Sequence, residues 1–194
     1  STTGKILRIS PDARKMENLA DSYDGYRFST IAGLTGSPLG DLFIGSPNSA
    51  TVYRHDPTLG KLFVLNEDLV RSNDLLIDST GNRLLVAESG PNRVVVYDLN
   101  SSGGLSRSWN LVKFPKGQAT PLSIDFLNDE ENLLVILLDR GKKLQIFDLQ
   151  RGKLLQSIEL PFTCQKIRSH GLWIYMQTKK GIRRIKTPMD LFVR

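Results

Sequence analysis

Cysteine and histidine are both scarce in this 194-residue chain. Cys164 is the single cysteine, so the sequence excludes an intramolecular disulfide and any metal site built from several cysteines. His55 and His170 are the two histidines, too few for a histidine-rich metal site. Apolar stretches are also short. The longest, from Leu133 to Leu138, is far below the roughly 18 residues that cross a bilayer, and it suits a buried strand.

Several catalytic and nucleotide-binding motifs are missing as well. The sequence contains no G-x-S-x-G, no Walker loop and no G-x-G-x-x-G. The segment GLTGSPLG from Gly33 has a different spacing and is interpreted as a loop between strands. Helical periodicity is nearly absent. A short helix is conceivable only over residues 11–24, where the match to a repeat described below favours a strand.

Positive charge is concentrated near the C-terminus. The chain has 26 Lys and Arg against 20 Asp and Glu, and residues 134–194 hold 13 basic and 4 acidic side chains. Such an excess attracts phosphate, nucleic acid or an acidic partner. No series of aromatic residues alternates with these Lys and Arg residues along the sequence, which weakens the nucleic-acid interpretation. Alternatively, the basic residues do not bind a partner and only form the solvated tip of a hairpin. The densest part, our candidate contact surface, is Lys179, Lys180, Arg183, Arg184 and Lys186.

Five segments share one pattern: a short strand, a polar turn and a second strand. With Ile6, Val52, Val94, Leu144 and Ile182 as equivalent positions, successive copies lie 46, 42, 50 and 38 residues apart. A period of about 40–50 residues with four strands per unit is typical of a β-propeller. In the middle three copies the strand ends in an aspartate that is expected to accept hydrogen bonds from turn amides. These aspartates are Asp56, Asp98 and Asp148.

Two further strands are expected before each shared segment. Strands such as Leu133–Leu138 are apolar on both faces and must be covered on both sides, as the inner strands of a propeller blade are. We therefore predict an all-β fold, a β-propeller or part of one, with four to five four-stranded blades. The predicted inner strands are 27–33 and 40–46, 73–79 and 83–89, 121–127 and 132–139, and 164–170 and 172–178, with a last strand at 190–193.

The first unit contains only its last two strands, which leaves two arrangements open. These strands complete the last blade of a small closed ring, or the chain is part of a larger, six-bladed ring whose first blades precede Ser1. The second is favoured, because five copies of the shared segment leave no single vacancy for closure. Residues 1–194 are thus expected to form one propeller domain that is incomplete at its N-terminus.

The third unit reads RSNDLLIDSTGNRLLVAESGPNRVVVYDL. It has an Asn before an apolar strand, a Ser/Asp-x-x-Gly turn, an LLVAE strand and an RVxxYDL ending. It resembles a blade of the gluconolactonase/regucalcin and strictosidine-synthase-like propellers, well over residues 4–100 and loosely beyond. Residues 133–160 read equally well as a WD-type blade. The resemblance implies a hydrolase of lactones or esters with one divalent metal, often Ca²⁺, at the top of the central channel.

The resemblance also implies one metal ligand, Asn73, whose amide oxygen suits Ca²⁺. The family's next ligand is an aspartate one blade later, and Leu122 occupies that position here. The family's acidic ligand from the first blade would precede Ser1. One amide without carboxylates cannot hold a metal tightly. Asp74 is expected to point away from Asn73 by strand alternation. The alternative for Asn73 is a turn residue that enters a strand.

Other chemistry-bearing residues have structural explanations. His55 is expected at the surface, His170 in a tight turn, and Cys164 as a small buried residue at the start of an inner strand. The tryptophans are expected to pack between blades and the phenylalanines to belong to the core. These residues are Trp109, Trp173, Phe28, Phe43, Phe63 and Phe147.

The sequence as a whole favours a non-catalytic propeller scaffold that binds a protein or another acidic partner. The alternative is a Ca²⁺-dependent lactonase or esterase-type hydrolase with Asn73 as a ligand. A weaker alternative is nucleic-acid or phosphate binding through the basic C-terminal part.

Overall fold

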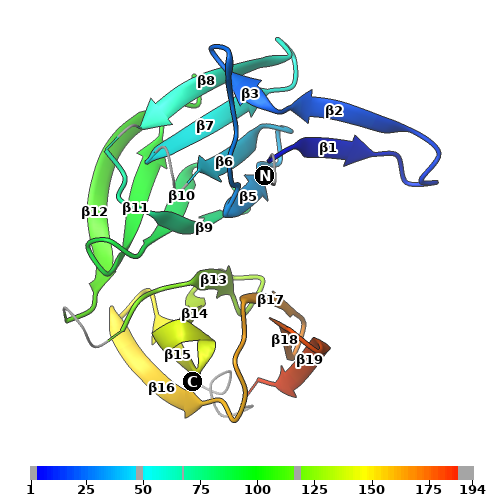
Figure 1. Cartoon of the computed structure of the whole chain (residues 1–194). Coiled ribbons are helices and arrows are strands. Elements are labelled where there is room, and N and C mark those ends of the chain that lie inside the picture. The colour runs from blue at the N-terminus through cyan, green and yellow to red at the C-terminus, as the bar shows by residue number, and fades with distance from the viewer. Residues whose placement is uncertain (1–3, 47–49, 67, 116–118, 188–194) are drawn as a thin grey trace.

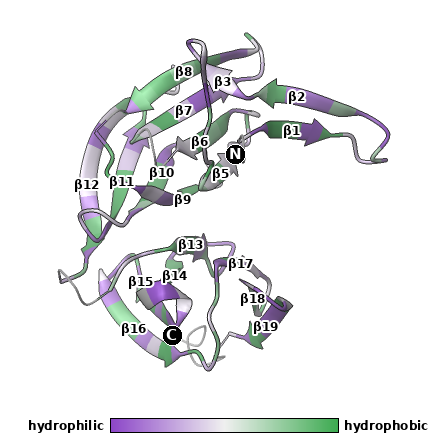
Figure 2. Ribbon diagram, in the orientation of Figure 1, coloured by the Kyte–Doolittle hydropathy of each residue, from purple (hydrophilic) through white to green (hydrophobic). Residues whose placement is uncertain are grey.

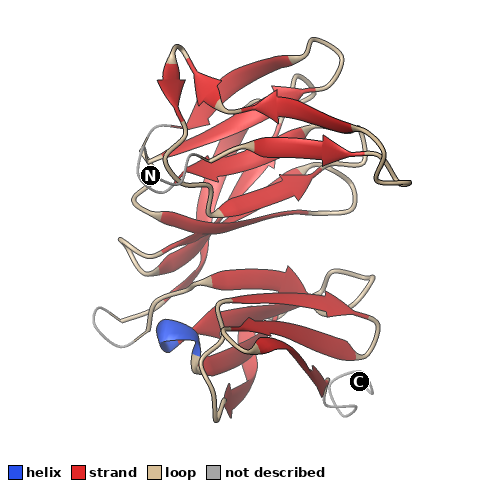
Figure 3. Cartoon of the chain, turned by 45° about the vertical axis from the view of Figure 1, so that its right-hand side comes forward, coloured by secondary structure: helices blue, strands red, loops and turns tan. Residues whose placement is uncertain are grey.

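The computed structural model describes residues 4–46, 50–66, 68–115 and 119–187. Almost every regular element in these residues is a β-strand. The exception is a single turn of 3₁₀ helix, η1 (Asp139–Gly141), drawn in blue in Figure 3. Within the described part of the chain, no helix has the length and apolar character needed to traverse a membrane.

Four antiparallel sheets form blades, each in chain order from its inner to its outer strand. Blade A contains β5 (Gly33–Gly36), β6 (Leu42–Ser46), β7 (Thr51–Asp56) and β8 (Lys61–Asn66). Blade B contains β9 (Ser72–Ile77), β10 (Arg83–Glu88), β11 (Arg93–Leu99) and β12 (Leu105–Lys113). Blade C contains β13 (Ser123–Phe126), β14 (Leu133–Leu138), β15 (Lys143–Asp148) and β16 (Lys153–Glu159). Blade D contains β17 (Lys166–His170), β18 (Trp173–Thr178) and β19 (Gly181–Lys186).

Two small hairpins precede the blades. One is the ribbon of β1 (Ile6–Ile9) and β2 (Met16–Ala20), and the other pairs β3 (Ser22–Tyr23) with β4 (Tyr26–Arg27). The strands of the ribbon correspond to the last two strands of the first repeat. A strand, not a helix, therefore forms within residues 11–24.

The blades are arranged radially. Strand β5 contacts β9, β9 contacts β13, and β13 contacts β17. Figure 1 shows these four inner strands near the centre of the view, with β8, β12 and β16 at the rim. The predicted all-β propeller arrangement is confirmed.

Hydrophobic contacts between neighbouring blades hold this arrangement together. The six side chains of β14 are all buried. Alternate residues point to opposite faces of the sheet, and a neighbouring blade covers each face. Leu134, Ile136 and Leu138 join the cluster with blade B, whereas Leu133, Val135 and Leu137 join the cluster with blade D. Two further clusters join blade A to blade B and blade A to the β1–β2 ribbon. Each buried aliphatic side chain contributes about 1.5–3 kcal/mol.

Two of the expected segments differ in the structure. The inner strand of blade A is Gly33–Gly36, not residues 27–33, so part of GLTGSPLG is a strand and only its later residues form a turn. An added Cβ at Gly33 would lie 2.7 Å from the backbone nitrogen of Leu75, and this explains why a glycine stands where β5 meets β9. The strand expected at 190–193 lies outside the described residues.

The aspartates at the strand ends behave as predicted in two of three cases. Asp56 accepts hydrogen bonds from the backbone N–H groups of Thr58 and Leu59, and Asp148 accepts one from Arg151. In the third case the turn amides bind the side chain of Asn100 instead, and Asp98 lies 3.8 Å from Arg83.

The core predictions hold for most aromatic residues. Phe28 and Phe43 are buried, and Trp109 and Phe147 pack at the junction of blades B and C. Phe63 is 38% exposed, because it lies on the outer strand of blade A. The expectation for Trp173 is also wrong. None of the hydrophobic clusters of the described residues includes it, and the guanidinium of Arg184 covers its ring at 4.2 Å.

Candidate functional site

The inner strands bring four equivalent residues to one level of the channel. Each of them pairs with a residue of the second strand of its blade, and that residue pairs in turn with a residue of the third strand. The third-strand residues are the equivalent positions of the sequence repeat, Val52, Val94, Leu144 and Ile182. The expected metal ligand, Asn73, lies one residue before Asp74 and therefore one level away from this set. The four equivalent residues are Gly33, Asp74, Ser123 and Lys166.

Asp74 is the centre of a charged cluster at this level. Its carboxylate is fully buried and lies 2.8 Å from the ammonium of Lys166 and 3.2 Å from the guanidinium of Arg168. Ser123 Oγ–H donates to it at 2.5 Å, and the Ile124 backbone N–H donates at 3.2 Å. The carboxylate of blade B is therefore neutralised from blade D and hydrogen-bonded from blade C.

Lys166 also joins blade D to blade A. Its ammonium donates a hydrogen bond of 2.7 Å to the carbonyl oxygen of Ala32, which immediately precedes β5. A side chain of one terminal blade thus reaches the first inner strand. No local sequence pattern indicates this contact, because the partners of Lys166 lie 92 and 134 residues away.

Inner-strand side chains also accept hydrogen bonds from the N–H groups of the following blade. Thr35 Oγ1 accepts from Ile77 at 3.3 Å, Asp74 accepts from Ile124, and Asp125 accepts from Ser169. An inner strand has an unpaired edge, so its N–H groups need such partners. Burial raises the pKa of Asp125, against the lowering effects of the Ser169 amide and of Arg168. Burial lowers the pKa of Arg168, but Asp74 and Asp125 together outweigh it, and the pKa is raised.

The raised pKa of Asp125 predicts a pH-dependent stability. A raised pKa means that the folded protein favours the protonated carboxyl. The contribution of Asp125 to stability is therefore fully present below the ordinary pKa of 3.8 and is lost as the pH rises through the raised pKa. Asp125→Asn keeps an oxygen that accepts from Ser169 but does not ionise. We expect the melting temperature of the variant, relative to wild type, to increase with pH across this window. A difference that is the same at every pH would contradict the prediction.

The residues around Asn73 do not fit a divalent metal site. The amide nitrogen of Asn73 donates to the carbonyl oxygen of Pro121 at 2.8 Å, a bond that does not involve the amide oxygen a metal would bind. The misfit lies in the surroundings. Leu122 stands at the position of the family's aspartate, and the carboxylate of Asp74 is paired with two cations. Asp74 does not point away as expected. Ala87 of β10 pairs with Asp74 and Glu88 pairs with Ser72, so Asn73 is the extra residue of a bulge in β9. The bulge interrupts the alternation of β9, and the side chains of Asn73 and Asp74 both reach residues 121–124 of blade C. Within residues 4–46, 50–66, 68–115 and 119–187, no three His, Cys, Asp or Glu side chains group as a metal site would require.

The other sequence candidates are not brought to this cluster. His55 is 7% exposed and lies between Leu42 and Leu62 on the neighbouring strands, so the expectation of a surface histidine is wrong. His170 is exposed and ends β17 beside a two-residue turn. Cys164 is buried as predicted. Burial raises the pKa of its thiol, which disfavours a nucleophilic thiolate.

The basic residues near the C-terminus form a hairpin. Lys179 and Lys180 make the turn between β18 and β19, and β19 carries Arg183, Arg184 and Lys186; all five side chains are exposed. The strand places Arg183 and Arg184 on opposite faces of the sheet. Arg183 lies 4.6 Å from the ring of Phe162, and Arg184 lies over Trp173. The sequence suggested one patch, and the structure divides it.

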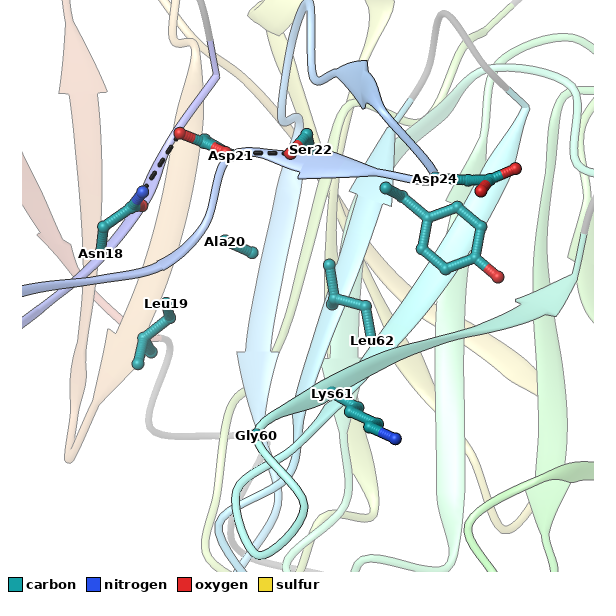
Figure 4. Close-up of a pocket in the computed structure, with 10 residues that line it drawn as sticks. Asn18, Leu19, Ala20, Asp21, Ser22, Asp24, Gly60, Lys61 and Leu62 are labelled. Carbon is teal, nitrogen blue, oxygen red and sulfur yellow. Dashed lines mark hydrogen bonds between the residues drawn. The ribbon is translucent and has the colours of Figure 1, made fainter.

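A cavity of about 430 Å³ lies between the chain at residues 18–24 and the start of β8 (Figure 4). Asp21 accepts hydrogen bonds from Asn18 and Ser22, and these contacts lower its pKa. Lys61 and Leu62 line the opposite side. The lining contains one hydroxyl beside a carboxylate, Ser22 with Asp21, but the lowered pKa of Asp21 makes it a weak base. The lining residues contain no histidine and no grouped set of metal ligands, so this cavity does not indicate a reaction.

Comparison with known proteins decides the family. The model of the SMP-30/gluconolactonase/LRE-like region matches residues 2–171. The chain belongs to this family. Membership confirms the resemblance seen in the third repeat unit. A comparison with curated protein sequences gave no match.

Solved structures agree with this family in fold. A luciferin-regenerating enzyme matches with a TM-score of 0.76 and 16% identity over 95% of this chain and 71% of its own. A gluconolactonase from Xanthomonas campestris matches with a TM-score of 0.76 and 18% identity over 94% of this chain and 64% of its own. A putative gluconolactonase matches with a TM-score of 0.74 and 21% identity over 92% of this chain and 65% of its own. The chain therefore spans about two thirds of the length of these members of the fold.

Proposed function

We propose that this chain is a non-hydrolysing member of the SMP-30/gluconolactonase/LRE-like family that binds an acidic polypeptide through its basic blade D. The main support is the composition of the channel. Leu122 replaces a carboxylate ligand, and one residue further along the inner strands the ammonium of Lys166 lies 2.8 Å from Asp74. The ammonium of Lys166 occupies this level and opposes a divalent cation, because like charges repel.

The basic hairpin supports the binding part of the proposal. Within the described residues, Lys179, Lys180, Arg183, Arg184 and Lys186 form no ion pair. Exposed, unpaired cations attract acidic partners and increase their association rate.

Two measurements test this function. The melting temperature is expected to be the same in CaCl₂ and in chelator, whereas a bound metal would stabilise the fold by mass action. A fluorescein-labelled peptide of alternating Glu and Val is expected to bind, and the triple variant Lys180→Glu, Arg183→Glu, Arg184→Glu should weaken it by at least about tenfold. A calcium-dependent melting temperature would restore the lactonase alternative. Unchanged peptide affinity in the triple variant would overturn the binding proposal.

A further inference from the structure

The two faces of blade D differ in chemistry. Ile174 and Met176 on β18 are buried against blade C, whereas the alternate residues Trp173, Tyr175 and Gln177 point to the other side. In contrast, β14 buries aliphatic side chains on both faces. The second face of blade D therefore lacks the aliphatic composition of the contacts between the other blades.

This second face has a regular layout across its three strands. Arg168, Tyr175 and Arg184 form one row, and His170, Trp173 and Lys186 form the next. The third row is Lys166, Gln177 and Ile182. We call these nine residues the polar face of blade D. They include four Lys or Arg and no Asp or Glu, and the ribbon of β19 is largely hydrophilic in Figure 2.

Two of the four cations are available to a partner. Lys166 and Arg168 turn toward Asp74 in the channel, whereas Arg184 and Lys186 are exposed and form no ion pair within the described residues. The ring of Trp173 lies 4.2 Å from the guanidinium carbon of Arg184. A guanidinium stacked on an aromatic ring is held in place, and its N–H groups remain able to bind a carboxylate. Ile182, 76% exposed, adds apolar surface beside them.

We propose that the polar face of blade D binds an extended acidic polypeptide segment with carboxylates two residues apart. This proposal rests on the proposed function and specifies its surface and its ligand. Arg184 and Lys186 lie two residues apart on one strand, a spacing of about 6.6–6.8 Å, which matches alternate side chains of an extended segment. Tyr175 and Ile182 contact the apolar side chains of the same segment.

A single-stranded nucleic acid is the competing ligand for a basic face with aromatic residues. The sheet places Trp173 and Tyr175 between cations, an interleaving that the linear sequence does not show. A base needs an uncovered ring to stack on, and Arg184 already covers Trp173. The ring of Tyr175 alone offers no series of stacking positions, so the face favours carboxylates over bases.

Adjacent residues on opposite faces provide a matched test. Arg184→Glu and Arg183→Glu make the same change of charge at neighbouring exposed positions of β19, and each removes a contact with an aromatic ring. We expect Arg184→Glu to weaken the Glu-Val peptide by at least about tenfold and Arg183→Glu by no more than about twofold. Arg184→Lys should retain part of the affinity. Melting temperatures near wild type confirm folding, and Arg184→Gln replaces Arg184→Glu if the latter does not fold.

The outcomes separate this proposal from the proposed function. Equal losses in Arg184→Glu and Arg183→Glu would overturn the assignment to the polar face and leave binding through the basic hairpin intact. No loss in these variants or in the triple variant would overturn both. An oligothymidine probe that binds more tightly than the peptide, and that Arg184→Glu releases, would overturn the choice of an acidic polypeptide.

Discussion

Replacing Asp74 with alanine is expected to destabilise the protein by about 3–5 kcal/mol. The change leaves the Lys166 ammonium and the Arg168 guanidinium without their carboxylate at the centre of the channel. It also removes the acceptor for Ser123 Oγ–H and for the Ile124 backbone N–H. Since these groups belong to blades C and D, the loss affects three blades. Chemical denaturation monitored by tryptophan fluorescence measures the change in the free energy of unfolding.

Lys166→Met provides the companion measurement. Its side chain is 27% exposed, so its removal should be less damaging than that of the fully buried carboxylate. In the double variant the two losses should be less than additive, because each single change leaves the other charge without its partner. Additive losses would show that the 2.8 Å contact contributes nothing to stability, and a loss below about 1 kcal/mol for Asp74→Ala would contradict the role of the cluster.

Gly141→Ala is expected to have the second large effect. Gly141 has φ of 82°, and an added Cβ would lie 1.7 Å from the carbonyl oxygen of Cys164. The same glycine accepts a hydrogen bond of 2.7 Å from the backbone N–H of Cys164, so the two chain segments cannot separate without losing this bond. A left-handed backbone costs alanine about 1–2 kcal/mol, and overpacking adds about 1–3 kcal/mol.

Gly152→Ala is the matched control. Gly152 has φ of 62°, but nothing lies within 4 Å of an added Cβ. Alanine at this position therefore has the backbone cost without the clash. Unfolding free energies should show a larger loss for Gly141→Ala. Equal losses would mean that the backbone conformation alone determines the cost at both positions.

Repetition made the fold predictable from the sequence. Equivalent apolar residues recur every 38–50 positions, and a strand such as Leu133–Leu138 has to be covered on both faces. The inner strand of blade A was misplaced, because Gly33–Gly36 has glycines where the other inner strands have larger side chains, and close packing against β9 explains them. The burial of His55 cannot be predicted from its own segment, because the residues beside it, Leu42 and Leu62, are on the two neighbouring strands.

The channel was much harder to predict than the blades. Asn73 was identified through a family motif, but Asp74, Lys166 and Arg168 belong to no local pattern. Their meeting depends on the relative height of the inner strands of blades B and D, which blade C separates along the chain. Likewise, Arg183 and Arg184 are one basic pair in the sequence, and only the ladder between β18 and β19 shows that they serve different faces.

The hydrogen bonds in which an inner-strand side chain accepts from the backbone N–H of another inner strand run in one direction along the chain. In the three described here, the side-chain acceptor comes before the amide donor: Thr35 before Ile77, Asp74 before Ile124, and Asp125 before Ser169. A ribosome releases the N-terminal residues first. Each nascent sheet would therefore meet its acceptors already in place on the previous one, so the propeller can be assembled in the order of its synthesis.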